Sequence, residues 1–101
     1  MPRFLIAVPH SEKKEGCEMA IRTFLDSGSH FLTNADWGCL DDVHKAWIII
    51  EAEDKQQARN ILPPAFRRQA VITMVNKFSL DDKDNLVSHH GYSDAAGGGK
   101  T

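Results

Sequence analysis

The order of apolar patterns along the chain constrains its fold more than any other feature. Six apolar segments follow one another before residue 80. Four are short runs or period-two alternations, which predict strands over about residues 3–8, 30–37, 46–52 and 70–80. The other two have the helical period and predict helices over about residues 11–27 and 54–62. The predicted order is therefore strand, helix, strand, strand, helix, strand.

Start and stop signals support both predicted helices. Ser27 and Gly28 follow the first helix, and glycine adopts the left-handed conformation that commonly ends a helix. Asp54 precedes the second helix and, with Gln57 three residues later, predicts a capping box. Pro63 ends that helix because proline disfavours helical backbone before it. The apolar stripe of the first helix consists of Cys17, Ala20, Ile21, Phe24 and Leu25, which makes Cys17 a small apolar packing residue.

This element order predicts an α+β fold of the ferredoxin-like βαββαβ type. Right-handed crossovers place both helices on one face of a four-stranded antiparallel sheet, with strand order 4-1-3-2. The other face carries apolar side chains such as Trp47 and Ile49 that no helix covers. Large exposed apolar faces usually mark interaction surfaces, so we expect a homodimer.

Residues 1–80 form the predicted domain, and residues 81–101 form a predicted disordered tail because they offer little apolar surface to bury. Twelve basic and fourteen acidic residues give a net charge of −2 without a basic stripe, which argues against nucleic-acid binding. No apolar run approaches the roughly 18–20 residues that span a bilayer. Cys17 and Cys39 form no paired motif, so a reduced, cytoplasmic setting is expected.

The segment from His30 to Trp47 reads HFLTNADWGCLDDVHKAW. With the predicted layout and the short length, it resembles the dimeric α/β-barrel superfamily, which includes muconolactone isomerases, cofactor-independent monooxygenases and YciI-like proteins. The chain is most similar to small bacterial members of that group that have no assigned activity. The resemblance covers about residues 3–80 and rests on the overall pattern, so no catalytic residue carries over. It implies two ferredoxin-like domains packed sheet to sheet around a pocket.

The same segment holds the densest group of chemically active residue types. In a strand at 30–37, His30, Asn34 and Asp36 share the uncovered sheet face, and antiparallel pairing brings Trp47 and Glu51 to that face. An imidazole, carboxylates and an amide beside an apolar surface are typical of a small-ligand pocket. His30 and Asp36 are candidates for a general acid–base pair, with Asn34, Trp47 and Glu51 as ligand-binding residues.

The loop between the middle strands suggests a different chemistry. Cys39, Asp41 and His44 offer thiolate, carboxylate and imidazole ligands, a mixture that suits zinc or another divalent transition metal. Three interpretations stay open at this point. The chain is an isomerase-like or monooxygenase-like enzyme acting on a small organic molecule, a non-catalytic metal-binding module, or a structural module whose polar residues form a dimer rim. Trp37 is assigned to the core, and Trp47 to the pocket or interface.

Overall fold

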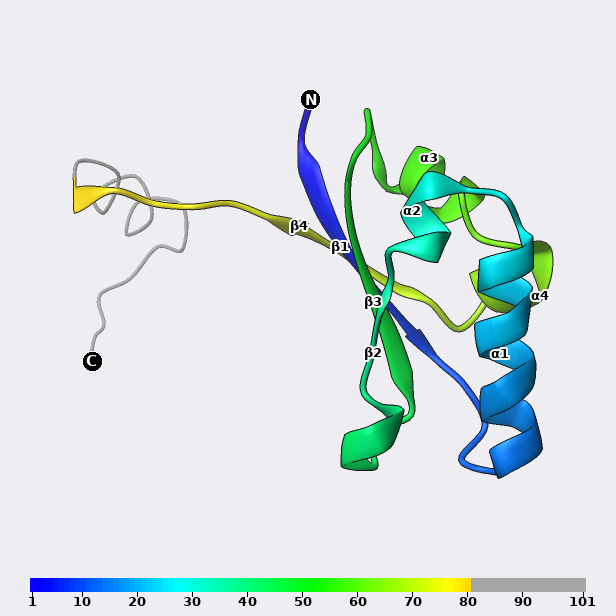
Figure 1. Cartoon of the computed structure of the whole chain (residues 1–101). Coiled ribbons are helices and arrows are strands. Elements are labelled where there is room, and N and C mark those ends of the chain that lie inside the picture. Colours follow the sequence, from blue (N-terminus) through cyan, green and yellow to red (C-terminus); the bar gives the residue numbers. More distant parts are fainter. Residues whose placement is uncertain (81–101) are drawn as a thin grey trace.

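The structure is a computed structural model that describes residues 1–80, and the predicted tail at 81–101 lies outside the described residues. Figure 1 shows the chain coloured along its sequence. The elements are β1 (Arg3–Pro9), α1 (Lys14–Asp26), α2 (His30–Thr33), β2 (Asp36–Trp37), the 3-10 helix η1 (Cys39–Asp41), β3 (Lys45–Glu51), α3 (Lys55–Asn60), α4 (Pro64–Arg67) and β4 (Val71–Val75).

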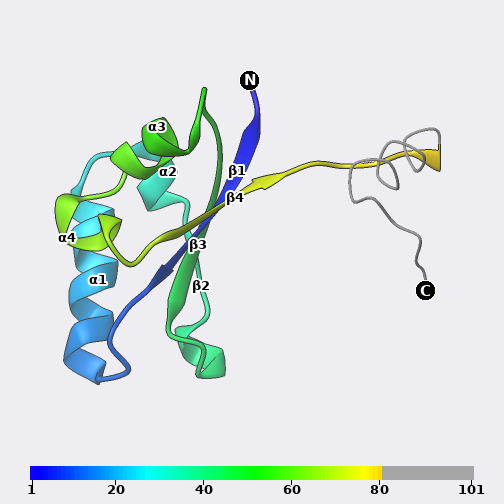
Figure 2. The same ribbon diagram turned by 180° about the vertical axis from the view of Figure 1, so that it is seen from behind.

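Within residues 1–80, four strands form one antiparallel sheet in the order β2-β3-β1-β4. This is the predicted order 4-1-3-2 read from the opposite edge, so the α+β class and the strand order are confirmed. Ile6 at the centre of β1 pairs with Ile48 on β3 and with Ile72 on β4. The α-helices of residues 1–80 all lie on one side of the sheet, as the two opposite views show (Figures 1 and 2).

The core fills the space between the sheet and the helices. Alternate residues of the two central strands are buried there: Phe4, Ile6 and Val8 on β1, and Ala46, Ile48 and Ile50 on β3. Phe24 of α1 is fully buried. Its ring packs edge to face against Trp37, with ring centroids 5.1 Å apart, and against Phe66, with ring centroids 5.4 Å apart. Trp37 therefore packs against the core, as predicted.

The helix boundaries follow the predicted signals. Gly28 has a φ of 76° directly after the last turn of α1, where a residue with a Cβ atom would be strained. Half of the predicted capping box is present at α3, since the backbone N–H of Gln57 donates to the carboxylate of the N-cap residue Asp54 at 2.8 Å. The Gln57 side chain accepts instead from the backbone N–H of Glu53, one residue before the N-cap, at 2.7 Å. Pro64 then begins the short α4 and does not simply end α3.

The strand predicted over residues 30–37 is wrong for most of its length. Residues His30–Thr33 form α2, and only Asp36–Trp37 pair with β3. Local hydrogen bonds explain the helix: the Ser29 hydroxyl accepts from the Leu32 backbone N–H, and Asn34 donates to the His30 carbonyl oxygen at 2.8 Å. Short polar side chains of this kind favour caps and turns over strands.

The helical turn also reverses part of the predicted face assignment. A strand over residues 30–37 would place Leu32 on the uncovered face with His30, but Leu32 is 2 % exposed and belongs to the core. The same strand would direct Phe31 into the core, but Phe31 is 45 % exposed. The period-two pattern of this segment was therefore coincidental, because a turn of helix directs its side chains at intervals of about 100° and not 180°.

No helix covers the other face of the sheet within the described part of the chain (Figure 2). Ile49 of β3 is 61 % exposed there, and Val71 of β4 is 60 % exposed. Leu5 and Trp47 lie on the same face and are half-buried. Among residues 1–80, none of the helices is both long enough and apolar enough to cross a bilayer.

Candidate metal centre

The antiparallel pairing of the two central strands brings two histidines together at one end of the sheet. Pro9, the last residue of β1, pairs with Lys45, the first residue of β3. His10, which directly follows β1, therefore lies beside His44, which directly precedes β3. The backbone N–H of His10 donates to the His44 carbonyl oxygen at 3.0 Å, and the two rings meet edge to face with centroids 5.9 Å apart.

Two cysteines complete the group from other elements. Cys17 lies near the start of α1, and Cys39 begins η1. The two Sγ atoms are 2.7 Å apart, and Nε2 of His10 lies 3.2 Å from Sγ of Cys39. One ligand atom from each of His10, Cys17, Cys39 and His44 lies within 4.8 Å of every other, and all four residues are half-buried.

The loop that carries Cys39 and His44 is held in shape by its own backbone. The Gly38 carbonyl oxygen accepts from the backbone N–H groups of Asp41 and Val43, at 3.0 Å and 2.9 Å. Gly38 has no room for a side chain, because an added Cβ would lie 2.7 Å from the Val43 carbonyl oxygen and 2.8 Å from the Trp47 ring. The loop can therefore close this tightly only with glycine at position 38.

Burial favours the uncharged forms of two of the potential ligands, His10 and Cys39. Burial lowers the pKa of His10, the neighbouring His44 ring lowers it further, and the Val8 backbone partly opposes both effects. Burial, followed by the hydrogen bond with the Cys17 thiol, raises the pKa of Cys39 to about 11. Without a cation, this end of the molecule therefore holds a neutral imidazole at position 10 and a protonated thiol at position 39 at neutral pH.

Two buried nitrogen atoms in this group lack partners. Nδ1 of His10 and Nδ1 of His44 are buried and make no hydrogen bond of good geometry. Nε2 of His44, in contrast, lies 3.0 Å from the Asp42 carboxylate. His10 already faces Cys39 with its other nitrogen, Nε2. Buried polar atoms are nearly always paired with protein, water or an ion, so the unpaired Nδ1 of His44 is available to a ligand.

The donor set matches one class of ligand closely. Two thiolates and two imidazoles form a common tetrahedral zinc site, and this group could hold zinc or a similar metal. Two sulfurs bound to one zinc lie about 3.8 Å apart, whereas a disulfide needs about 2.05 Å. The separation of 2.7 Å between Cys17 and Cys39 lies between these values. The two sulfurs would therefore have to move apart by about an ångström to bind one zinc ion. They would have to approach by a smaller distance to form a disulfide.

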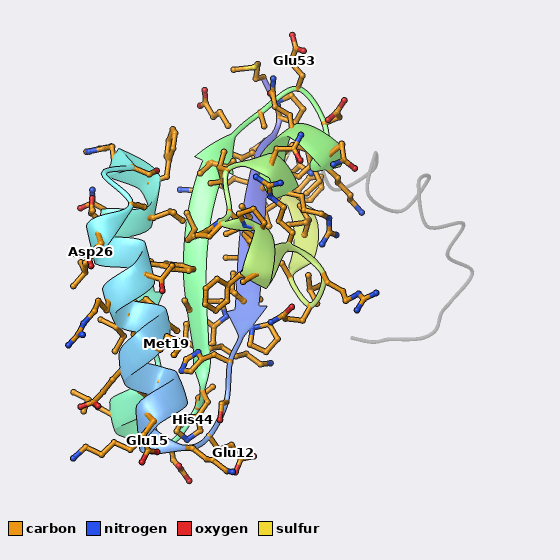
Figure 3. All side chains as sticks on the ribbon, turned by 90° about the vertical axis from the view of Figure 1, so that its right-hand side faces the viewer. Glu12, Glu15, Met19, Asp26, His44 and Glu53 are labelled. Carbon is orange, nitrogen blue, oxygen red and sulfur yellow. The ribbon has the colours of Figure 1, made fainter. Side chains whose placement is uncertain are left out.

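Acidic side chains occur around the same end of the molecule. Figure 3 shows His44 near the start of α1, with Glu12 and Glu15 at the same end. Glu12 and Asp42 also line an open hollow of about 430 Å³ that is bordered by His10 and His44. Carboxylates in these places favour the approach of a cation, because unlike charges attract over several ångströms.

The structure separates the residues that the sequence grouped together. Cys39 and His44 belong to the four-residue group, but the predicted metal ligand Asp41 does not. Four other predicted residues line a second hollow of about 400 Å³ on the uncovered sheet face: His30, Asn34, Asp36 and Trp47. Glu51 lies on β3 and does not line that hollow. The sequence therefore joined residues that the fold divides between two separate regions.

Sequence reasoning missed His10 and Cys17 as potential ligands. Cys17 was interpreted as an apolar packing residue, but its sulfur contacts Cys39 and it is not part of the buried core. A usable signal was present, because the predicted strand order already placed the end of the first strand beside the start of the third. His10 and His44 flank those two strand ends, and each has a cysteine within seven residues.

The comparisons with known proteins add no assignment. No protein-family model, curated protein or solved structure matches the chain. The donor atoms, their distances and their surroundings are therefore the basis for the function proposed next.

Proposed function

We propose that this protein binds one zinc ion through His10, Cys17, Cys39 and His44. The observation that carries the proposal is the convergence of four donor atoms, from three separate parts of the chain, within 4.8 Å of one another. Solvated surface residues rarely converge in this way with two cysteines and two histidines. The unpaired buried Nδ1 of His44 supports the same conclusion.

The proposed role of the ion is structural. Four protein ligands fill a tetrahedral zinc shell and leave no position for a substrate or a reactive water. The ion would join the end of β1, the start of α1 and the loop before β3, which otherwise meet through few large apolar side chains. Small domains gain much of their stability from such metal crosslinks, because an apolar core of this size is marginal alone.

Cobalt titration tests the proposal. Co²⁺ replaces Zn²⁺ in tetrahedral thiolate sites and gives visible absorption and a sulfur-to-metal charge-transfer band. We expect saturation at one Co²⁺ per chain, followed by loss of the spectrum when Zn²⁺ is added. Cys17→Ser and Cys39→Ser should each remove the charge-transfer intensity from one sulfur and weaken binding strongly.

Two controls locate the metal. His30→Ala removes a histidine outside the group, and replacing both His89 and His90 with alanine removes the histidine pair that follows Ser88. Both variants should bind Co²⁺ like the wild type. Absence of saturable binding to the reduced protein would refute the proposal, and so would binding that survives both cysteine substitutions. Free thiols should also be counted in freshly purified protein. A disulfide between Cys17 and Cys39 would indicate that the two cysteines form a covalent crosslink and do not bind a metal ion.

A second candidate function concerns the hollow on the uncovered sheet face. We propose that it binds a small organic molecule, with His30 and Asp36 as an acid–base pair of an isomerase-like or monooxygenase-like enzyme. The hollow supports this because it combines these two groups with the apolar side chains of Leu5, Trp47 and Ile49. Phenol is a suitable probe, since its ring fits an apolar surface and its hydroxyl can donate to a carboxylate.

The phenol test uses chemical shifts of the labelled protein. Phenol should cause saturable shift changes centred on the residues of this hollow, and Asp36→Asn should bind phenol more weakly. Asp41→Asn removes an acidic side chain outside the hollow and should bind phenol like the wild type. A lack of saturable shifts at millimolar phenol would argue against ligand binding here.

We further propose that two copies pair through the uncovered sheet faces, as in the dimeric α/β barrels that the ferredoxin-like layout resembles. The exposure of Ile49 and Val71 supports this, because such apolar area is usually covered. On that face β3 begins with Lys45 and ends with Glu51. A twofold axis that passes between Trp47 and Ile49 would therefore place Lys45 of each copy against Glu51 of the other copy.

A further inference from the structure

We propose that Asp42 is a positioning residue for the metal centre and that His44 binds the metal through Nδ1. This inference rests on the proposed zinc site and specifies which nitrogen takes part and why. It follows from an unusual backbone conformation, from the contact between Asp42 and His44, and from the different surroundings of the two ring nitrogens.

Asp42 has a backbone conformation that needs an explanation. Its φ is 62°, and among residues 1–80 it is the only non-glycine residue with a positive φ. The backbone N–H of Asp42 donates to the Cys39 carbonyl oxygen at 3.1 Å, which ends η1 with this left-handed residue. Aspartate is among the residues that tolerate this conformation best, although glycine would adopt it without cost. This turn places the Asp42 side chain beside the His44 ring.

The side chain of Asp42 meets one nitrogen of His44 from the solvent side. Its carboxylate lies 3.0 Å from Nε2, and the side chain of Asp42 is 97 % exposed while that of His44 is only 19 % exposed. The other nitrogen, Nδ1, is buried and has no hydrogen-bond partner. The ring therefore presents Nε2 to the carboxylate outside and Nδ1 to the interior, where Cys17, Cys39 and His10 lie.

The carboxylate decides which nitrogen carries the hydrogen. An ionised carboxylate can only accept, so Nε2 must be the protonated donor. A neutral imidazole has one N–H and one free lone pair, and the lone pair then belongs to Nδ1. A metal ligand needs that lone pair. Asp42 thus selects the tautomer in which the inward-facing nitrogen is ready to bind the ion, before the ion arrives.

Hydrogen bonds of this kind strengthen metal binding in a known range. A carboxylate behind a metal-bound histidine fixes the ring and increases its basicity, and losing it typically costs 10- to 100-fold in affinity. The Asp42 side chain is almost fully exposed, and water competes for such a hydrogen bond. We therefore expect the lower limit, about a tenfold loss.

Zinc affinities of three variants test this role, measured by competition with a chelator of known affinity. Asp42→Gly removes the acceptor and adopts the left-handed backbone freely, so it should bind Zn²⁺ about tenfold more weakly. Asp42→Asn keeps a neutral acceptor and should lose less. Asp41→Asn removes the same charge one residue away and should bind like the wild type, which separates the hydrogen bond from the general effect of charge.

Long-range ¹H–¹⁵N spectra of the imidazole rings give a readout that a merely structural role would not change. In the zinc-bound wild type, His44 should show a metal-bound Nδ1 and a protonated Nε2. Binding of His44 through Nε2 would overturn the inference, and so would an Asp42→Gly affinity equal to that of the wild type. In either case the zinc site itself would stand. A wild-type protein that binds no zinc would instead refute the proposed function.

Discussion

The zinc ion should stabilise the fold because its ligands converge only in the folded chain. Cys17 and Cys39, for example, are 22 residues apart in the sequence. An ion that binds the folded chain and is released on unfolding contributes RT ln(1 + [Zn²⁺]/Kd), which is about 3 kcal/mol when the free Zn²⁺ concentration is on the order of 150 times Kd. For a domain of about 80 residues, this corresponds to an increase in Tm of roughly 12–24 °C.

Thermal unfolding followed by circular dichroism measures this effect. The reduced protein is compared in excess chelator and in a small excess of Zn²⁺, with Mg²⁺ as the control because it prefers oxygen ligands. Cys39→Ser should unfold near the Tm of the metal-free wild type in both conditions, since the replacement is nearly isosteric. Equal Tm values with and without Zn²⁺ in the wild type would refute the reasoning, and so would an undiminished increase in Cys39→Ser.

Four further predictions test the metal centre, the core and the uncovered sheet face. Gly38→Ala should lower stability by about 1–3 kcal/mol, measured by urea unfolding, and should weaken Zn²⁺ binding, because the added Cβ displaces the loop; wild-type stability would contradict this. Phe24→Ala should cost about 3–5 kcal/mol without changing metal stoichiometry, since this ring is fully buried. In excess chelator, the free energy of unfolding should fall as pH rises from about 9 towards 11. The folded chain retains the Cys39 proton in this range, whereas the unfolded chain releases it at lower pH. Urea midpoints measured across this range should show the fall in the wild type and not in Cys39→Ala. Ile49→Glu should give a monomer by light scattering at micromolar concentration, whereas Met19→Glu, equally exposed on α1, should not; a persisting dimer in Ile49→Glu would place the interface elsewhere.

Most of the fold could be predicted from local patterns. The apolar alternation of β1 and β3, the glycine after α1 and the N-cap at Asp54 all describe interactions between residues close in sequence. These features determined the order of elements, and connection rules then determined the strand order. The turn at His30 was missed because the hydrogen bonds of Ser29 and Asn34 outweigh an alternation that suits a strand equally well.

The candidate metal centre could be predicted only in part. Cys39 and His44 share one loop, so their spacing drew attention to them. His10 and Cys17 reach the same place through strand pairing and helix packing, which no local pattern encodes. Asp41 was included because it is adjacent in sequence, but the 3-10 turn leaves it outside the group of four.

X-ray absorption at the zinc edge of the reduced, zinc-loaded protein tests the central claim most directly. Two sulfur neighbours at about 2.3 Å and two nitrogen neighbours at about 2.0–2.1 Å are expected, at one ion per chain. A shell of oxygen and nitrogen atoms without sulfur would contradict a site built from Cys17 and Cys39.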